Sequence, residues 1–422
     1  MGLLGWLLSL FGGSKNRPTA RAAERSAPRR AKVWHRTRLS RRLDWRSAAA
    51  REVPASAGKS LPYRFARRST FTGQYLDLSG DLDRERLGRR GLPAFATPDE
   101  LADWLQLPTG KVAWLTARFV PGERFTVARS HYVYRWKPKR SGGARLIESP
   151  KQLLRSVQTR ILREILDRVP PHANAHGFTA ERSIRTNALP HCGQTVVVKW
   201  DLSDFYATVR FNRVVAIFRS LGYSREAAIW LASLTTTAAP PDLPIDAASM
   251  QEVKPYAFRH LPQGAPTSPA IANLSAFSLD VRLTGLAQAY GAAYTRYADD
   301  LTFSGDDRFA RRLQNVIPLV EQVIRSERFH VHPDKRKVLR RGQRQSVAGV
   351  VVNDRPNIRR EEYDRLKAIL HNAARHGAAS QNREGHPDFE AHLRGRISHV
   401  AMLNPARGER LLRLFERVRF EH

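Results

Sequence analysis

Two adjacent carboxylates, Asp299 and Asp300, separate two short runs of strand-forming residues, and this arrangement limits the fold more than any other part of the chain. Residues 293–297 precede them and residues 301–304 follow them, and both runs contain the aromatic, β-branched and apolar residues that favour strands. Aspartate is unfavourable within a strand but common in turns. We therefore predict a β-hairpin with both carboxylates at or beside its bend. Because neighbouring carboxylates repel each other unless a cation lies close by, a third carboxylate is expected near them.

Asp201 is the candidate for that third carboxylate. It follows residues 195–200, a β-branched run that is too short for a typical helix and is predicted to be a strand. If this strand lies beside the hairpin, Asp201, Asp299 and Asp300 converge. Carboxylates together with substrate phosphates suit Mg²⁺, and two such ions about 3.5–4 Å apart stabilise the attacking and leaving oxygens of a phosphoryl transfer. The alternative is that each aspartate is only a turn or solvated loop residue.

Three segments resemble the motifs of reverse transcriptases in both order and spacing. Tyr297-Ala-Asp-Asp300 resembles the catalytic box, Asp201-Leu-Ser-Asp-Phe-Tyr206 the first palm aspartate motif, and Leu261-Pro-Gln-Gly-Ala-Pro-Thr-Ser-Pro269 the nucleotide-site motif. Within this family the chain is most similar to the bacterial retron enzymes. Their Asn-Ala-x-x-His signature occurs as Asn187-Ala-Leu-Pro-His191, and their Val-Thr-Gly signature as Val347-Ala-Gly349, with alanine replacing threonine. The resemblance is detailed over residues 136–353 and looser beyond them.

The resemblance implies an α+β right-hand polymerase with fingers, a palm and a helical thumb, preceded by a basic N-terminal extension. The expected divisions are residues 1–90 for the extension, 91–200 for N-terminal helices and fingers, 201–352 for the palm with a connecting segment at 211–262, and 353–422 for the thumb.

Two arginines are expected near the phosphates of an incoming nucleotide. Residues 132–147 are predicted to form a hairpin with a basic tip, which could close over a triphosphate and neutralise its charge. The resemblance implies that Arg145 of this hairpin contacts the nucleotide and that Arg182 lies near its phosphates, which a planar guanidinium can bind in a bidentate way. The alternatives are a solvated tip for Arg145 and a structural pair with a carboxylate for Arg182.

Three further residues are implied as nucleotide-binding. Tyr206 matches the aromatic residue that packs against the sugar and excludes a 2′-hydroxyl, which predicts a preference for deoxynucleotides; the alternative is a core tyrosine. Gln263 matches a residue near the nucleotide sugar. Lys335 matches a lysine near the pyrophosphate leaving group, with Lys337 as the competing assignment.

The retron signatures supply the candidate RNA-binding residues. These are Asn187, His191, Val347 and Gly349. For Asn187 and His191, a role in packing and turn stabilisation is an equal alternative.

Composition points to a polyanionic partner. The 422 residues carry a formal net charge of +32, which favours nucleic acid over an anionic membrane surface. The region from Ser14 to Arg68 is a basic arm in which Trp34 and Trp45 could stack on bases or anchor the arm to the body. The single cysteine, Cys192, excludes internal disulfides and Cys-based zinc sites and favours a reducing cytoplasm. No apolar run is long enough to span a bilayer, so no stable membrane insertion is expected.

The resemblance implies an RNA-directed DNA polymerase that uses Mg²⁺ and dNTPs. A retron enzyme binds a structured non-coding RNA, primes from a 2′-hydroxyl and makes a short single-stranded DNA that stays branched to the RNA. Family membership further implies antiphage defence, often with an effector protein encoded nearby. The alternatives are a group II intron-like enzyme, a template-independent defence polymerase and a non-catalytic RNA-binding scaffold.

Overall fold

The computed structural model describes residues 61–69, 72–116, 126–139, 142–244 and 250–420, all of which belong to one compact unit spanning residues 36–422. Trp34, Trp45 and most of the expected basic arm lie outside the described residues. The expectations about that arm therefore remain predictions.

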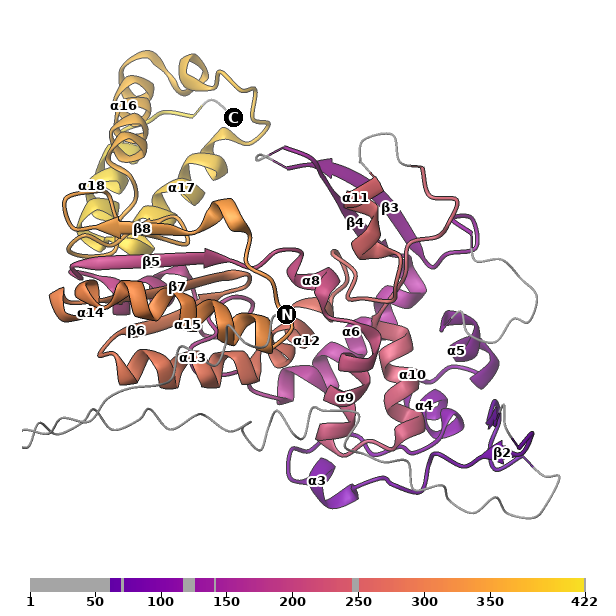
Figure 1. Cartoon of the computed structure of the whole chain (residues 1–422). Coiled ribbons are helices and arrows are strands. Elements are labelled where there is room, and N and C mark those ends of the chain that lie inside the picture. Colours follow the sequence, from indigo (N-terminus) through magenta and orange to yellow (C-terminus); the bar gives the residue numbers. More distant parts are fainter. Residues whose placement is uncertain (1–60, 70–71, 117–125, 140–141, 245–249, 421–422) are drawn as a thin grey trace, which may run out of the picture. The chain divides into compact units, whose positions relative to one another are not determined.

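A four-stranded antiparallel sheet organises this unit, with the strand order β6-β7-β5-β8 (Figure 1). Its strands are β5 (Val196–Asp201), β6 (Ala293–Tyr297), β7 (Asp300–Gly305) and β8 (Lys337–Arg340). The predicted hairpin is confirmed as β6 and β7, and the predicted strand before Asp201 is confirmed as β5, which pairs with β7.

The two faces of the sheet are buried in different hydrophobic clusters. Val196, Val198 and Trp200 of β5 join the main core, whereas Val197 between them joins a second cluster. This alternation follows from the period of two in a strand. Since both faces are covered, β5 is almost continuously apolar. β7 alternates apolar and polar residues, but its polar residues Thr302 and Ser304 are buried as well.

Helices pack around the main core. The longer ones are α4 (Pro98–Leu105), α6 (Gln152–Glu164), α9 (Phe211–Leu221), α10 (Arg225–Thr235), α12 (Ser268–Ser275), α13 (Phe277–Ala289) and α15 (Leu313–Ser326). The shorter ones are α3 (Arg84–Gly88), α5 (Thr109–Leu115), α7 (Ile184–Ala188), α8 (Phe205–Thr208), α11 (Met250–Val253) and α14 (Asp307–Arg311), with 3₁₀ turns η1 (Leu166–Arg168), η2 (Leu189–His191), η3 (Lys254–Tyr256) and η4 (Pro333–Lys335). Leu87 of α3 is fully buried in this core, so part of the expected N-terminal extension docks onto the body.

Three small hairpins complete the strands. The predicted basic hairpin is confirmed as β3 (Tyr132–Pro138) and β4 (Ala144–Pro150). The other two pair β1 (Arg67–Arg68) with β2 (Tyr75–Leu76) and β9 (Ser346–Val347) with β10 (Val350–Val351).

The C-terminal helices have a core of their own. Helices α16 (Arg360–His376), α17 (Phe389–Leu403) and α18 (Pro405–Phe415), together with the 3₁₀ turn η5 (Ala378–Gln381), contribute most of the second hydrophobic cluster, which also includes Val197 and Val347. None of the helices in the described ranges is long and apolar enough to cross a bilayer.

Candidate active site

The three aspartates meet at one end of the central sheet. Asp299 lies in the turn between β6 and β7, and Asp300 begins β7 directly opposite Asp201 in the β5–β7 register. The backbone NH of Leu202 donates to the carbonyl oxygen of Asp299 over 3.0 Å, which fixes the end of β5 to the turn. Ala298 closes the turn with a φ of 56°, in the left-handed region. The local fold thus brings Asp201 to a pair of adjacent carboxylates that lie 98 residues or more further along the chain.

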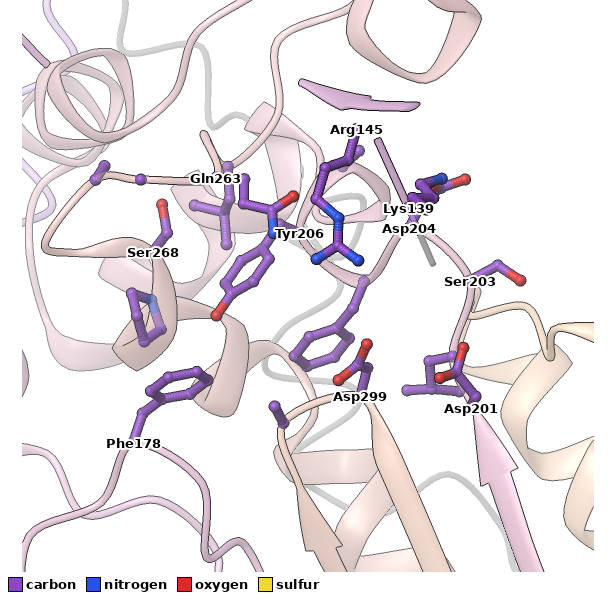
Figure 2. A pocket seen from close by; sticks show the side chains of 18 of the residues that line it. Lys139, Arg145, Phe178, Asp201, Ser203, Asp204, Tyr206, Gln263, Ser268 and Asp299 are labelled. Carbon is purple, nitrogen blue, oxygen red and sulfur yellow. The ribbon is translucent and has the colours of Figure 1, made fainter. Parts of the chain in front are cut away.

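A cavity of about 1250 Å³ opens at this end of the sheet. It is larger than the roughly 300–1,000 Å³ typical of small-ligand pockets, so it has room for more than a mononucleotide. Six of the predicted site residues line it: Asp201, Asp299, Arg145, Tyr206, Gln263 and Lys335. Figure 2 shows Asp299, Arg145, Tyr206 and Gln263 around one common space, although they come from four separate segments. Asp300 is not part of the lining, although it lies opposite Asp201 in the β5–β7 register.

The carboxylates are electrostatically crowded. Burial, followed by the negative charges of Asp300 and Asp201, raises the pKa of Asp299 to about 6. Burial also raises the pKa of Asp300, with Asp201 adding to the shift and Lys199 opposing it. A cation placed among these oxygens would relieve the repulsion that raises both pKa values.

The donor set suits a divalent cation that is held partly by substrate. Within the described ranges, no three His, Cys, Asp or Glu side chains are close enough together to enclose a metal ion. Mg²⁺ is usually bound through one or two carboxylates plus substrate phosphates rather than by a complete protein cage. Asp201 and Asp299 on the cavity wall, with Asp300 beside them, fit that pattern.

Lys335, rather than Lys337, faces the cavity. The ammonium of Lys335 lies 3.0 Å from Asp201 Oδ1 in a half-exposed ion pair. Lys337 is exposed, pairs with Lys199 in the β5–β8 register and does not contribute to the cavity lining. The geometry therefore favours Lys335 in the choice that the sequence left open.

Polar and basic groups line the opposite side of the cavity. Arg145 lies on β4, and Lys139 at the same hairpin tip is 3.8 Å from Asp204. Gly264 has a φ of 134°, and a Cβ there would approach the carbonyl oxygen of Glu148 to 3.0 Å. Glycine is therefore required for β4 and the loop at Gln263 to come this close, which places Gln263 beside Arg145 on the wall. Arg155, Phe178, Ser268 and His332 also line the cavity, although they were not among the predicted site residues.

Arg182 lies elsewhere, contrary to expectation. It is not part of the cavity lining. Its Nη1 donates to the carbonyl oxygens of His172, Ala173 and Ala175, at 3.0, 2.5 and 2.7 Å. In this structure the arginine donates to the backbone carbonyls of the loop that precedes it rather than to a carboxylate.

The retron signature residues, for which RNA contact was expected, are mostly buried. Asn187 and His191 are 1% and 0% exposed, and Val347 is 0% exposed. The two ring nitrogens of His191 lie 2.6 Å from Ser304 Oγ and 2.8 Å from Thr295 Oγ1, so this ring joins η2 to β6 and β7. Gly349 alone is exposed, in the β9–β10 turn with a φ of 85°. These signatures hold the sheet and its neighbours together.

A buried ion pair behind the turn was not identified from the sequence. Arg296 and Asp280 are both 0% exposed, and the guanidinium donates to both carboxylate oxygens at 2.8 and 2.6 Å. Arg296 also donates to Asn273 Oδ1 and to the carbonyl oxygen of Ala298, each over 3.0 Å. Tyr294 donates to Asp280 over 2.8 Å. The available signal was an arginine in the middle of an otherwise apolar strand, which requires a buried partner.

Comparison with known proteins agrees with these motifs. Residues 137–362 match the family described as reverse transcriptase (RNA-dependent DNA polymerase). The Retron Mx65 reverse transcriptase of Myxococcus xanthus is 43% identical over 331 residues, which cover 78% of this chain and 74% of the relative. The Retron Mx162 reverse transcriptase of the same organism is 40% identical over 342 residues, covering 78% and 68%. The chain belongs to the retron reverse transcriptases.

More distant relatives give the same result. The Retron Ec86 reverse transcriptase of Escherichia coli is 32% identical over 229 residues, covering 54% of this chain and 64% of the relative. The reverse transcriptase is therefore an RNA-directed DNA polymerase with a reverse-transcriptase fold, and it acts with a template RNA and dNTPs. The resemblance inferred from the sequence motifs is confirmed.

Proposed function

We propose that Asp201, Asp299 and Asp300 form the catalytic centre and that the enzyme copies part of a structured non-coding RNA into a short single-stranded DNA. The observation that carries this proposal is the meeting of these three aspartates beside a cavity lined by Arg145, Lys335 and other polar groups. A 2′-hydroxyl of the RNA would serve as the primer, so the DNA would remain branched to the RNA.

Asp201, Asp299 and Asp300 would hold two Mg²⁺ ions, which supply the charge that stabilises the attacking and leaving oxygens of a phosphoryl transfer. The raised pKa of Asp299 and of Asp300 supports a cation at this position, since the protein alone leaves their charges poorly compensated.

The other cavity residues would select and orient the nucleotide. Arg145 would pair with its phosphates and Gln263 would contact the sugar region. Tyr206, which is largely buried beside Asp299, would form a wall that leaves no room for a 2′-hydroxyl. Lys335 would leave Asp201 to stabilise or protonate the pyrophosphate.

The elements divide naturally into the parts of a right-hand polymerase. The β3–β4 hairpin and the helices before β5 would be the fingers, the central sheet with α12, α13 and α15 the palm, and α16–α18 the thumb. The separate hydrophobic cluster of α16–α18 supports a thumb that begins near residue 353. Since the template RNA of a bacterial retron is made in the cytoplasm, we place the enzyme there, in antiphage defence beside an effector encoded nearby.

The test combines two measurements on the protein expressed with its native upstream DNA. First, extension of a primed RNA template by dNTPs is measured. Second, co-purifying nucleic acid is resolved on a denaturing gel with and without RNase and debranching treatment. We expect extension and a discrete short DNA that shortens slightly on treatment, with both lost in Asp299→Ala/Asp300→Ala. The matched control is Asp307→Ala, an exposed carboxylate outside the cavity lining, which should retain both.

Each failure would point to a different function. Extension without a branched product would indicate a group II intron-like enzyme or a general polymerase. DNA made without any template would indicate a template-independent polymerase. If the double alanine variant made DNA at the normal rate, the three aspartates would not be the catalytic centre.

A further inference from the structure

A second cavity, remote in sequence from the aspartates, lies among the C-terminal helices. It has a volume of about 490 Å³ and is formed by α16, the segment that follows α16, and α17. Helix α18 packs against both α16 and α17 and so holds them in place around it. The size is suited to one small ligand and is too small for a nucleic acid duplex.

Regular helix spacing builds two of the cavity walls. Arg365, Ile369 and Asn372 recur along one face of α16, and Phe389, His392 and Arg396 recur along one face of α17. Residues three, four and seven apart share a helix face, so each helix presents a continuous stripe to the cavity.

The third wall is a shaped turn. Asn382 Oδ1 accepts from the NH of His386 over 2.8 Å, and Asn382 Nδ2 donates to the carbonyl oxygen of His386 over 2.9 Å. Gly385 has a φ of 64°, which suits the tight bend. This turn fixes His386 against α17, with its Nε2 3.3 Å from Glu384.

Three rings of the cavity form an ordered stack. The rings of His386 and His392 are 3.9 Å apart between centroids and 17° from parallel. Phe389 is also nearly parallel to each histidine ring, at 11°. Parallel aromatic faces are the surfaces on which unpaired bases stack in protein–RNA complexes.

Three arginines line the same cavity without a partner. Arg365, Arg383 and Arg396 make no hydrogen bond or ion pair with any residue in the described part of the chain. On α16 and α17, Arg360 and Arg394 each pair with a carboxylate one turn away. Glu384 is the single carboxylate in the lining. Three guanidiniums around one carboxylate leave an excess of positive charge that an anion, and a phosphate in particular, would neutralise.

We propose that this cavity binds one unpaired nucleotide of the partner RNA, with its base against the His386–His392 stack and its phosphate among Arg365, Arg383 and Arg396. The inference rests on the proposed RNA partner and adds to it a site for recognising a single base that is separate from the catalytic cavity. A protein surface that binds an RNA duplex needs only contacts with the phosphates. This cavity offers contacts for a phosphate together with aromatic rings on which a base can stack, so it suits an unpaired nucleotide.

The first experiment compares charge-matched variants. Arg365→Gln/Arg396→Gln should weaken binding of the native RNA about tenfold or more, since it removes two phosphate contacts. The control, Arg375→Gln/Arg410→Gln, removes the same charge from exposed positions outside the cavity and should cost less than about threefold. Extension of a generic primed RNA template measures whether each variant remains folded and catalytic. Equal losses of affinity in the two pairs would overturn the inference.

The second experiment identifies the base. Each unpaired nucleotide of the native RNA is replaced in turn by an abasic nucleotide, and affinity is measured for the wild type and for His392→Ala. One abasic site should weaken wild-type binding roughly tenfold and should weaken His392→Ala binding little further, because the stacking partner is already missing. If no abasic site behaves in this way, the base does not enter the cavity.

A free nucleotide could offer the same chemistry, and this source is tested directly. AMP and dATP at millimolar concentration are added to the wild type and to Arg365→Gln/Arg396→Gln during thermal unfolding. Stabilisation of the wild type alone, with unchanged RNA affinity in the variant, would assign the cavity to a free nucleotide and overturn the RNA assignment. If the wild type neither extends primed templates nor binds its RNA, the proposed function fails before this inference is reached.

Discussion

Two ion pairs lie near the turn between β6 and β7, and they differ in almost every respect. Arg296–Asp280 lies behind the turn, with both side chains 0% exposed and a closest distance of 2.6 Å. Lys335–Asp201 lies at the cavity, with side chains 40% and 20% exposed and a distance of 3.0 Å. The first pair has further hydrogen bonds to Tyr294, Asn273 and Ala298, whereas the second has only the one contact between lysine and carboxylate.

This difference indicates that the Arg296–Asp280 pair is structural, whereas the Lys335–Asp201 pair can be broken and re-formed. A buried ion pair gains little net stability over apolar residues, but removing one partner leaves an unpaired buried charge and is costly. A half-exposed pair is worth little in folding free energy because water can replace either partner. Under the proposed function, Asp201 and Lys335 would therefore exchange each other for substrate without unfolding the turn, while Arg296 holds the turn through the carbonyl oxygen of Ala298.

The largest expected effect comes from breaking the buried pair. Arg296→Ala should lower the free energy of unfolding by about 3–5 kcal/mol, because Asp280 would be left charged and without its main partner. The control is Arg163→Ala, which removes an exposed pair with Asp167 on α6 and should cost under about 0.5 kcal/mol. Urea unfolding measures both. A loss below about 1 kcal/mol in Arg296→Ala would show that the pair is not a scaffold.

A double substitution separates stability from positioning. Arg296→Met/Asp280→Leu should recover much of the lost stability, since apolar residues can replace a buried pair. It should still extend primed templates more slowly than the wild type, because the carbonyl of Ala298 loses its donor beside Asp299.

Breaking the exposed pair should affect rate rather than folding. Lys335→Ala should lower the extension rate at saturating dNTP about 10–100-fold, since it removes a charge beside the leaving group, with little change in unfolding. Lys337→Ala, two residues along and outside the cavity lining, is the matched control and should stay within about twofold of the wild type. If Lys337→Ala slowed extension and Lys335→Ala did not, Lys337 would be the lysine near the leaving group.

The same contrast explains how far the sequence predicted the site. The hairpin at Asp299 and the strand before Asp201 follow from local residue preferences, so both were predictable. For Arg182, Asn187 and His191 the sequence left a structural role and a ligand contact both open, because motifs indicate importance but not burial. The ring of His191 lies against hydroxyls of Thr295 and Ser304, which are distant in sequence, and only tertiary packing brings these groups together. The pairing of Asp280 with Arg296 could not be identified without the fold.

His191 is another buried titratable group, and unlike the two ion pairs it is uncharged in the folded protein. Burial, with a contribution from His176, lowers the pKa of His191 from 6.5 to about 3. The unfolded chain takes up a proton near pH 6.5 while the folded chain does not, so stability is fully present above that pH and is lost as pH falls toward 3. This residue alone should cost about 2 kcal/mol at pH 5 relative to pH 8.

The measurement is urea unfolding at both pH values. His191→Gln should be less stable at pH 8 but should lose less stability on acidification than the wild type. His399→Gln, an exposed histidine on α17, should keep the wild-type pH dependence. Identical pH dependence in all three proteins would mean that His191 titrates in the folded protein as it does in the unfolded chain.

The smallest expected effect tests how much one hydrogen bond to the buried ion pair contributes to stability. Tyr294→Phe removes one hydroxyl that donates to Asp280 over 2.8 Å and leaves both guanidinium contacts intact. A hydrogen bond to a charged group is worth about 1.5–3 kcal/mol, and the lower end applies here because Asp280 keeps its other donors. Urea unfolding should therefore show a loss near 1.5 kcal/mol, while extension of primed templates stays close to wild type because Arg296 still holds Ala298. A large loss of activity with little loss of stability would instead make the hydroxyl part of the positioning of the turn, and the scaffold would then extend from Arg296 to Tyr294.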